Sequence, residues 1–348
     1  MIVKAQAVLY NVVTHNIGVA ALDEDIKFSA GVVDLAKEGL RSQLVSYFLD
    51  HFKEPEFFSF TFSSGDLGLN PVYNFASNIF DNPSCIHEQS VKIARHLYNQ
   101  SKHPNIKSGD LFVAYFQDVL IDDELVNAVA IFKSEVKDAY LKVEFDKHIA
   151  SIIADEGTSL DKLDKACIIF NTERDAGFKI MNIDHSNRSK EAKYWAEDFL
   201  TITPRGDDYY YTKQFIKLTK DFVKNRMPKE FDADTTDQAA VLNRSLNYFQ
   251  AVDKFDAMEY SEQVFKDGNV VEAFQDFKNE KAMLVDRSLE DNFQVSEFAV
   301  KKNSKSFKSI LKLDKNFHVY IHGDQSMIEK GQDTDGRKFY KLYFDQEQ

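Results

Sequence analysis

Cysteine is scarce in this chain of 348 residues, which contains only Cys85 and Cys167. Two cysteines at no metal-type spacing exclude a disulfide framework and a zinc-binding cysteine cluster, and they are typical of a reducing cytosol. Glycine and proline are also few, at 13 and 6 residues, which favours long helices joined to a modest sheet. No segment reaches the ~18 consecutive apolar residues that a membrane helix needs. The sequence therefore predicts a cytoplasmic protein without a membrane-spanning helix.

Basic residues are fewer than acidic ones. The chain has 43 Lys and Arg residues and 56 Asp and Glu residues, so its net charge is -13. This balance argues against a protein coated in positive charge. The hydrophobic content of 43% and charged content of 28% are those of a soluble globular protein. The 30 Phe and 15 Tyr residues could stack on bases, but core packing explains them better.

Apolar periodicity predicts an α+β first half. Helices are expected over residues 33–52 and 84–100, where apolar residues recur at helical spacing and should lie on a sheet. Three closely spaced strands are expected to form an antiparallel meander, and two more to form a hairpin. These strands cover residues 111–119, 125–133 and 140–145, then residues 166–170 and 178–183. The opening apolar residues are interpreted as a first strand or helix, because Gln6 and Asn11 interrupt the apolar run that a signal peptide requires.

The second half is expected to be mainly helical and to end in strands. Pro204 and Gly206 stand together among polar residues, which divides the chain into a domain of residues 1–203 and a domain of residues 204–348. Helices are expected over residues 192–200 and 209–226, after a capping box at Thr235 and Gln238, and near Glu262 and Glu272. Strands are expected over residues 310–313, 317–321 and 338–344, the last after a turn at Asp335 and Gly336. The predicted fold is α+β in two domains: an N-terminal, largely antiparallel sheet with helices, then a helical segment with a small antiparallel sheet.

Motifs for catalysis and for cofactor or metal binding are weak. Residues 63–68 contain two glycines but lack the Lys-Ser/Thr pair of a phosphate-binding loop. His318 and His322 would lie roughly 13 Å apart along a strand, too far for one metal ion to bind both. Residues 333–336 lack the remaining ligands of a calcium loop. The sequence therefore assigns no catalytic, cofactor-binding or metal-binding residue, and an enzyme is not predicted.

The strongest enzymatic alternative is a metal-dependent nuclease around Glu144 and Asp146. These acids lie on a predicted strand with Lys147, the kind of setting in which carboxylates hold catalytic metal ions. Glu144 and Lys147 are three residues apart, however, and so face opposite sides of a strand. No upstream acidic partner stands out, which makes the nuclease the weaker alternative.

Two basic segments give the positive signal. Residues 211–229 and residues 301–323 each contain six basic residues and one acid, so together they carry +10 and leave -23 for the other 306 residues. In the first segment, lysines at 213, 217, 220 and 224 step by 4, 3 and 4, which makes one stripe on a helix. Phe215, Leu218 and Phe222 are expected to bury another face of that helix. The residues expected to contact phosphate are Lys213, Lys217, Lys220, Lys224, Arg226, Lys301, Lys302, Lys305 and Lys308.

The order of these elements resembles a known family. The resemblance lies in residues 3–9, 109–116, 163–170 and 192–200 and in the β-rich end after Ser309. By these segments the chain resembles the bacterial nucleoid-associated protein family of the NdpA/YejK type. The resemblance implies a cytoplasmic protein that co-localises with the chromosome and binds DNA, and it supplies no catalytic residues.

The leading hypothesis from the sequence is a nucleoid-associated protein that contacts the phosphate backbone of double-stranded DNA without reading its bases. The alternative is an interaction scaffold on the nucleoid, whose acidic surface contacts basic proteins. Other nucleoid proteins and a second copy of the chain stay open as partners.

Overall fold

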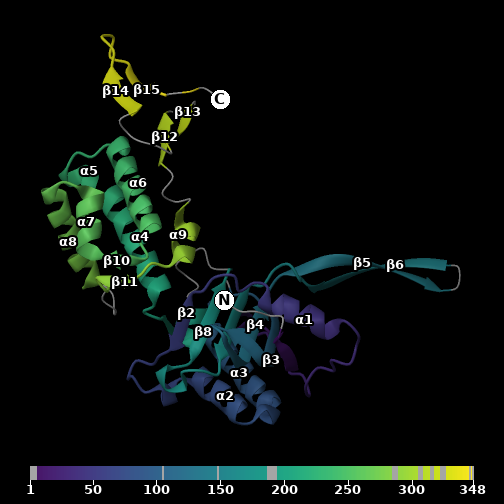
Figure 1. Ribbon diagram of the computed structural model, residues 1–348. Coiled ribbons are helices and arrows are strands. Elements are labelled where there is room, and N and C mark those ends of the chain that lie inside the picture. The colour runs from purple at the N-terminus through teal and green to yellow at the C-terminus, as the bar shows by residue number, and fades with distance from the viewer. Residues whose placement is uncertain are drawn as a thin grey trace. The chain divides into compact units, whose positions relative to one another are not determined.

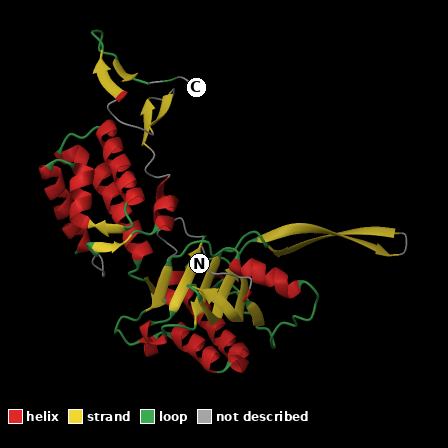
Figure 2. Cartoon of the chain, viewed as in Figure 1, coloured by secondary structure: helices red, strands yellow, loops and turns green. Residues whose placement is uncertain are grey.

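Two compact units make up the chain, Met1–Arg205 and Gly206–Gln348 (Figure 1). The computed structural model of the protein describes residues 6–103, 106–146, 149–185, 194–283, 289–304, 309–313, 317–321, 327–344 and 346. Figure 2 shows that the first unit is built around a sheet, whereas the second consists mainly of helices followed by short strands. The predicted α+β fold class is confirmed.

Within the described part of the first unit, seven strands form one antiparallel sheet in the order β1-β3-β4-β7-β8-β2-β9. These strands are β1 Val8–Ile17, β2 Phe57–Phe60, β3 Gly109–Ile121, β4 Glu124–Ser134, β7 Lys165–Phe170, β8 Lys179–Asp184 and β9 Ile202–Pro204. The hairpin predicted at residues 166–170 and 178–183 is confirmed as β7 and β8, which pair directly.

Helices cover both faces of this sheet. Helix α1 (Leu40–Leu49) packs on one face, while α2 (Pro71–Asp81) and α3 (Ile86–Gln100) pack on the other. Along β3, Val113 and Tyr115 belong to the core under α2 and α3, whereas Ala114 and Phe116 belong to the core under α1. Since successive side chains of a strand point to opposite faces, a sheet covered on both sides needs apolar residues at every position. This requirement explains the continuous apolar runs in the sequence.

Short helical turns complete the first unit. They are 3-10 turns at Ala20–Leu22, Leu67–Leu69, Pro83–Cys85 and Arg174–Ala176, and a π-helical turn at Trp195–Leu200. The predicted helix over residues 84–100 is confirmed as α3. The helix predicted from residue 33 begins only at Leu40, because Gly39 has a left-handed backbone with φ of 77°, which interrupts a right-handed helix.

The predicted place of residues 140–145 as the third strand of the meander is wrong. Residues 140–145 do form a strand, β5 (Lys137–Asp146), but among the strands that the structure describes β5 pairs with β6 (Ile149–Thr158) alone, in a separate two-stranded ribbon. The place beside β4 is taken by β7, in which all six residues are buried. A strand with charged residues at alternate positions, as β5 has, cannot occupy a place that is covered on both faces.

The second unit is built from helices that pack around α4 (Asp208–Asn225). The other helices are α5 Met227–Glu230, α6 Thr235–Ala251, α7 Ala257–Phe265, α8 Gly268–Ala282 and α9 Glu297–Ser304. Three pairs of short strands accompany them: β10 Lys254–Asp256 with β11 Asn292–Gln294, β12 Ser309–Leu313 with β13 Phe317–Ile321, and β14 Ile328–Gln332 with β15 Lys338–Leu342. The predicted capping box is wrong by one residue, since Asp234 and Asp237 form it. One carboxylate oxygen of Asp234 accepts hydrogen bonds from the backbone N–H groups of Thr236 and Asp237.

Within the described ranges, no helix combines the length and the apolar character that crossing a membrane would require.

Candidate nucleic-acid interface

The predicted lysine stripe lies on helix α4, at the boundary between the buried and the exposed sides of the helix. Phe215, Leu218 and Phe222 are all buried, as the sequence predicts. Lys217 and Lys224 are exposed, whereas Lys213 and Lys220 are half-buried. The stripe therefore has two fully hydrated ammonium groups alternating with two that lie closer to the apolar core.

Half-burial changes the acid–base chemistry of Lys220. The pKa of its ammonium is lowered to about 8, mainly by burial and also by the neighbouring charge of Lys224, while Asp221 acts in the opposite direction. An ordinary exposed lysine has a pKa of about 10.4. Lys220 therefore changes charge near neutral pH, and a phosphate placed against it would favour the charged form.

Two aromatic rings connect the lysine stripe to the second basic segment. The ammonium of Lys213 lies 5.8 Å from the centroid of the Tyr209 ring, and the Tyr209 ring lies 6.4 Å from the ring of Phe298 at the start of α9. The backbone N–H of Ser296 also donates to the hydroxyl of Thr212 at 3.0 Å. These contacts hold α9 against α4, beside which it is drawn in Figure 1.

Helix α9 presents its lysines to solvent while its other side is buried. Ala299 and Val300 are buried, and Lys301 and Lys302 are exposed. Residues three and four positions apart share one side of a helix, so Lys301 and Lys302 lie on the side of Phe298. Lys301 and Lys302, the first lysines of the second basic segment, are thus carried by a helix next to the one that carries the first segment.

The remaining predicted residues have different surroundings. Arg226 is held by carboxylates, because its guanidinium donates to Glu230 at 2.8 Å and to both carboxylate oxygens of Glu280 at 3.0 Å. The hydrogen bonds that Arg226 donates to Glu280 raise the pKa of the guanidinium. Lys305 and Lys308 lie outside the described residues.

A cation that the sequence did not single out lies beside the stripe. A hollow of about 240 Å³ runs along α4 and is lined by Lys217 and Asp221 of α4 and by Lys281 at the end of α8. Lys281 comes from another helix, so spacing along α4 could not reveal it. Two lysines and one aspartate therefore line this hollow.

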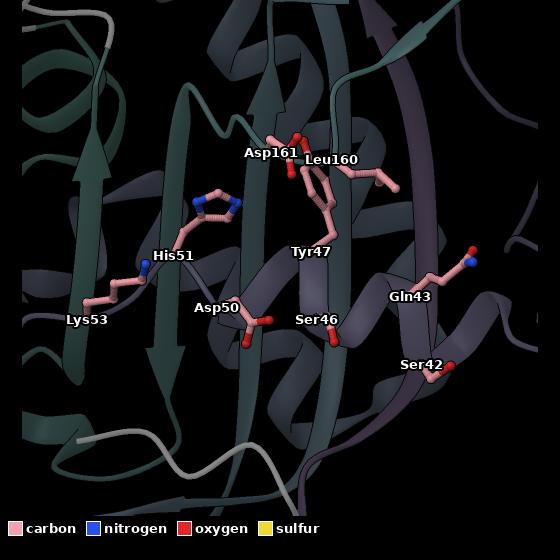
Figure 3. Close-up of a pocket in the computed structure, with 9 residues that line it drawn as sticks. All are labelled: Ser42, Gln43, Ser46, Tyr47, Asp50, His51, Lys53, Leu160 and Asp161. Carbon is pink, nitrogen blue, oxygen red and sulfur yellow. The ribbon is translucent and has the colours of Figure 1, made fainter. Parts of the chain in front are cut away.

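The first unit has a polar hollow of about 520 Å³ between α1 and the segment after β6. Figure 3 shows Tyr47 reaching toward Leu160 and Asp161, with His51 beside it. Lys53 and His51 share this hollow with Asp50 and Asp161, and burial lowers the pKa of His51. Carboxylates in the same hollow disfavour a phosphate, and a neutral imidazole adds no charge to attract one.

A serine and a histidine meet in the first unit, but the pair is inaccessible. The Nε2 atom of His15 lies 2.9 Å from the hydroxyl oxygen of Ser90, and both residues are buried. The other ring nitrogen of His15 accepts a hydrogen bond from the backbone N–H of Ser29. That bond leaves no carboxylate to orient the imidazole as a catalytic triad requires, so the pair fastens the loop at Ser29 to β1 and α3.

The acids of the nuclease alternative lie on the exposed β5–β6 ribbon. Glu144 forms an ion pair with Lys142. Among the residues that the structure describes, no three His, Cys, Asp or Glu side chains are grouped so that they could hold a metal ion.

Comparison with known protein families gives one match. The family model NA37, described as nucleoid-associated protein YejK, matches residues 19–336, which is most of the chain. The resemblance noted in the sequence is thereby confirmed. No curated protein matches the chain.

Proposed function

The chain belongs to the NA37 family of nucleoid-associated proteins, and we propose that it serves the nucleoid by binding double-stranded DNA directly. The contacts are made by the basic surface of the helical unit, which consists of Lys213, Lys217, Lys220, Lys224, Lys301 and Lys302. Binding uses the phosphate backbone and does not depend on base sequence. The protein catalyses no reaction on the DNA.

The observation that supports this proposal most strongly is the packing of α9 on α4 through Phe298 and Tyr209. This packing gathers lysines from both basic segments on one unit. Lysines that neutralise phosphates release condensed counterions, and that release supplies most of the free energy of sequence-independent binding. A gathered set of lysines can contact several phosphates of one duplex at once.

The acidity of the rest of the chain limits how binding occurs. Outside the two basic segments the net charge is -23, so most of the protein surface repels a phosphate backbone. DNA is therefore expected to bind in one orientation, weakly, and with strong dependence on salt.

A salt titration of DNA affinity tests the proposal. In the variant Lys217→Glu, Lys224→Glu, both exposed lysines of the stripe are reversed. The slope of log K against log salt is negative, and each lost phosphate contact should make it shallower by about 0.9. The double variant should therefore reduce the magnitude of the slope by about 2. The matched control is Lys254→Glu, Lys338→Glu, which reverses two exposed lysines of the same unit outside the basic surface.

Three outcomes would contradict direct binding by this surface. The first is a slope that the stripe variant does not change, and the second is an equal change in the control. The third is no DNA binding at low salt together with capture of nucleoid proteins, which would favour the scaffold. Magnesium-stimulated cleavage of DNA that Glu144→Ala abolishes would instead establish a nuclease.

A further inference from the structure

The β5–β6 ribbon exposes large apolar side chains of the kind that folded proteins usually bury. In Figure 1 it extends away from the seven-stranded sheet. All ten residues of β5 and the first eight of β6 are exposed. The two strands pair over ten positions, from Lys137 with Thr158 to Asp146 with Ile149, which makes the ribbon roughly 34 Å long.

The two faces of the ribbon differ sharply in polarity. Directly paired residues share a face, and faces alternate along each strand. One face carries Lys137, Glu156 and Thr158 at its root. The rest of that face, which we name the apolar face, consists of Ala139, Leu141, Val143, Phe145, Ala150, Ile152 and Ala154. Its large side chains are mostly uncovered by the residues that the structure describes: Leu141 is 70%, Val143 54%, Phe145 74% and Ile152 69% exposed.

The opposite face has its own covering contacts. The ring of Tyr140 lies over Gly157, where an added Cβ would come within 3.2 Å of it. The hydroxyl of Tyr140 donates to Asp155 at 3.3 Å, and Lys142 forms an ion pair with Glu144. Charged groups make most of this face compatible with water, and Ile149 is its one strongly exposed large apolar side chain among the described residues, at 76%. The continuous apolar surface lies on the apolar face.

The root of the ribbon is fixed to the sheet. The carboxylate of Asp110 on β3 accepts hydrogen bonds from the Thr158 hydroxyl at 3.0 Å and from Lys137. Asp164 accepts from the backbone N–H groups of Glu135 and Val136 at 2.6 and 3.1 Å. These bonds hold the base of both strands, yet an isolated two-stranded hairpin is only marginally stable in water. Coverage of the apolar face would supply the missing stabilisation.

We propose that the apolar face is a self-association surface, on which the ribbon of one chain packs face to face with the ribbon of a second copy. A two-fold axis would run the ribbons antiparallel and bring the same patch of each chain against the other. Flat apolar sheet faces pack in this way at a separation of about 10 Å. The charged faces of both ribbons would then point outward into water.

The area available matches a reversible dimer. Side chains of these sizes and exposures present roughly 500 to 700 Å² of apolar surface per ribbon, so pairing would remove on the order of 1,000 to 1,400 Å² from water. Specific interfaces bury about 1,200 to 2,000 Å². The contact is therefore large enough for a specific dimer, at the weaker end of the range.

The charge of the ribbon disfavours nucleic acid as the partner. Its described residues include two lysines, Lys137 and Lys142, and five acids. The acids are Asp138, Glu144, Asp146, Asp155 and Glu156. A ribbon with this excess of negative charge repels phosphates, whether they belong to DNA or to an anionic lipid surface. A second copy covers the apolar face and leaves the four acids of the opposite face hydrated, while Glu156 lies at the root of the ribbon beside Ala139.

Sedimentation of the full chain over a range of concentrations tests the proposal with two neighbouring substitutions. Ile152→Lys places an ammonium on the apolar face, whereas Ile153→Lys changes the next residue, which is 43% exposed on the opposite face. The wild-type chain and Ile153→Lys should both dimerise. Ile152→Lys should raise the dissociation constant of the dimer at least about tenfold, because the charge would have to be buried.

Cross-linking gives a second, geometric readout in the background Cys85→Ser. A bifunctional thiol reagent should join two chains that carry Val143→Cys, near the middle of the apolar face, and should not join chains that carry Lys142→Cys. A wild-type chain that stays monomeric up to its solubility limit would overturn the proposal. So would equal dissociation by Ile152→Lys and Ile153→Lys, or equal cross-linking at residues 142 and 143. These measurements contain no DNA, so their failure is distinct from failure of the proposed function.

Discussion

The rings of Tyr209 and Phe298 lie 6.4 Å apart between their centroids, although 89 positions separate the two residues. Tyr209 lies in the first turn of the lysine-bearing helix α4, and Phe298 lies in the first turn of α9. The same tyrosine ring lies under the ammonium of Lys213 at 5.8 Å. This aromatic contact, together with the hydrogen bond from Ser296 to Thr212, therefore holds the helices that carry the lysines of the proposed DNA-binding surface.

DNA affinity should depend on pH through Lys220. Burial lowers the pKa of this lysine to about 8, so the ammonium loses its proton as the pH rises from 7 to 9. Because a phosphate binds the charged form, affinity should fall by up to about tenfold over that interval. Fluorescence anisotropy with a labelled duplex measures this at constant salt. Lys220→Arg keeps a positive charge and should bind equally well at both pH values, and a wild-type affinity that does not change with pH would contradict the assignment.

Arg226 should contribute less to DNA binding than its neighbour Lys224. The guanidinium of Arg226 already donates to Glu230 and Glu280, whereas Lys224 is exposed at the end of α4. Lys224→Gln should reduce the magnitude of the slope of log K against log salt by about 0.9, and Arg226→Gln should reduce it by much less. Equal slopes for the two variants would show that DNA displaces the carboxylates from Arg226.

Loss of the Tyr260 hydroxyl should destabilise the helical unit. This hydroxyl lies 2.6 Å from the hydroxyls of both Thr219 on α4 and Ser245 on α6, and all three residues are buried. Tyr260→Phe would remove a shared hydrogen-bond partner and should cost about 1 to 3 kcal/mol of unfolding free energy. Urea denaturation followed by circular dichroism measures the cost. Tyr140→Phe removes an exposed hydroxyl from the ribbon and should cost less than about 0.5 kcal/mol.

The buried ion pair of Lys133 and Glu135 should be essential to the sheet-based unit. Their charged atoms lie 2.8 Å apart, and the side chains are 0% and 6% exposed. Glu135→Gln leaves a buried ammonium without its counterion and should cost about 3 kcal/mol. In the exposed pair of Lys92 and Glu88, Glu88→Gln should cost less than about 0.5 kcal/mol.

The same pair gives a test by pH, with a defined sign. Burial lowers the pKa of Lys133, and removal of Glu135 would lower it further. Between the folded pKa and the unfolded pKa of about 10.4, the unfolded state binds more protons, so stability rises with pH. The destabilisation by Glu135→Gln should therefore shrink as the pH is raised toward 10. A cost that is constant with pH would indicate that Lys133 is neutral in the folded protein.

Local patterns predicted the elements well where one face of a helix or strand decides its place. The spacing of Phe215, Leu218 and Phe222 predicted the buried side of α4, and these residues are buried. The turn at Gly177 predicted the β7–β8 hairpin, whose strands pair directly. Helical periodicity and hairpin turns act over a few residues, so a single sequence contains the information that specifies them.

Partnerships between distant segments could not be read in the same way. Residues 140–145 form the predicted strand, but their alternating polarity fits a half-exposed strand in any sheet and does not identify β6 as the only partner. The acid that neutralises Arg226 most strongly is Glu280, which lies 54 positions away. Lys281 belongs to another helix but lines the same hollow as Lys217. Counting charges along one segment therefore overestimates the positive charge that some residues offer to a ligand and omits cations from other helices.

The sequence by itself determined the fold class, the family and the existence of two basic segments in an acidic chain, because composition, periodicity and local charge are properties of short stretches. Only the tertiary structure decided that α9 packs on α4, that Arg226 is paired, that burial lowers the pKa of Lys220 and that the apolar face of the β5–β6 ribbon is uncovered. Each of these depends on which distant residues share a neighbourhood. Desolvation and ion pairing act through space over a few ångströms, and the folded chain alone sets those distances.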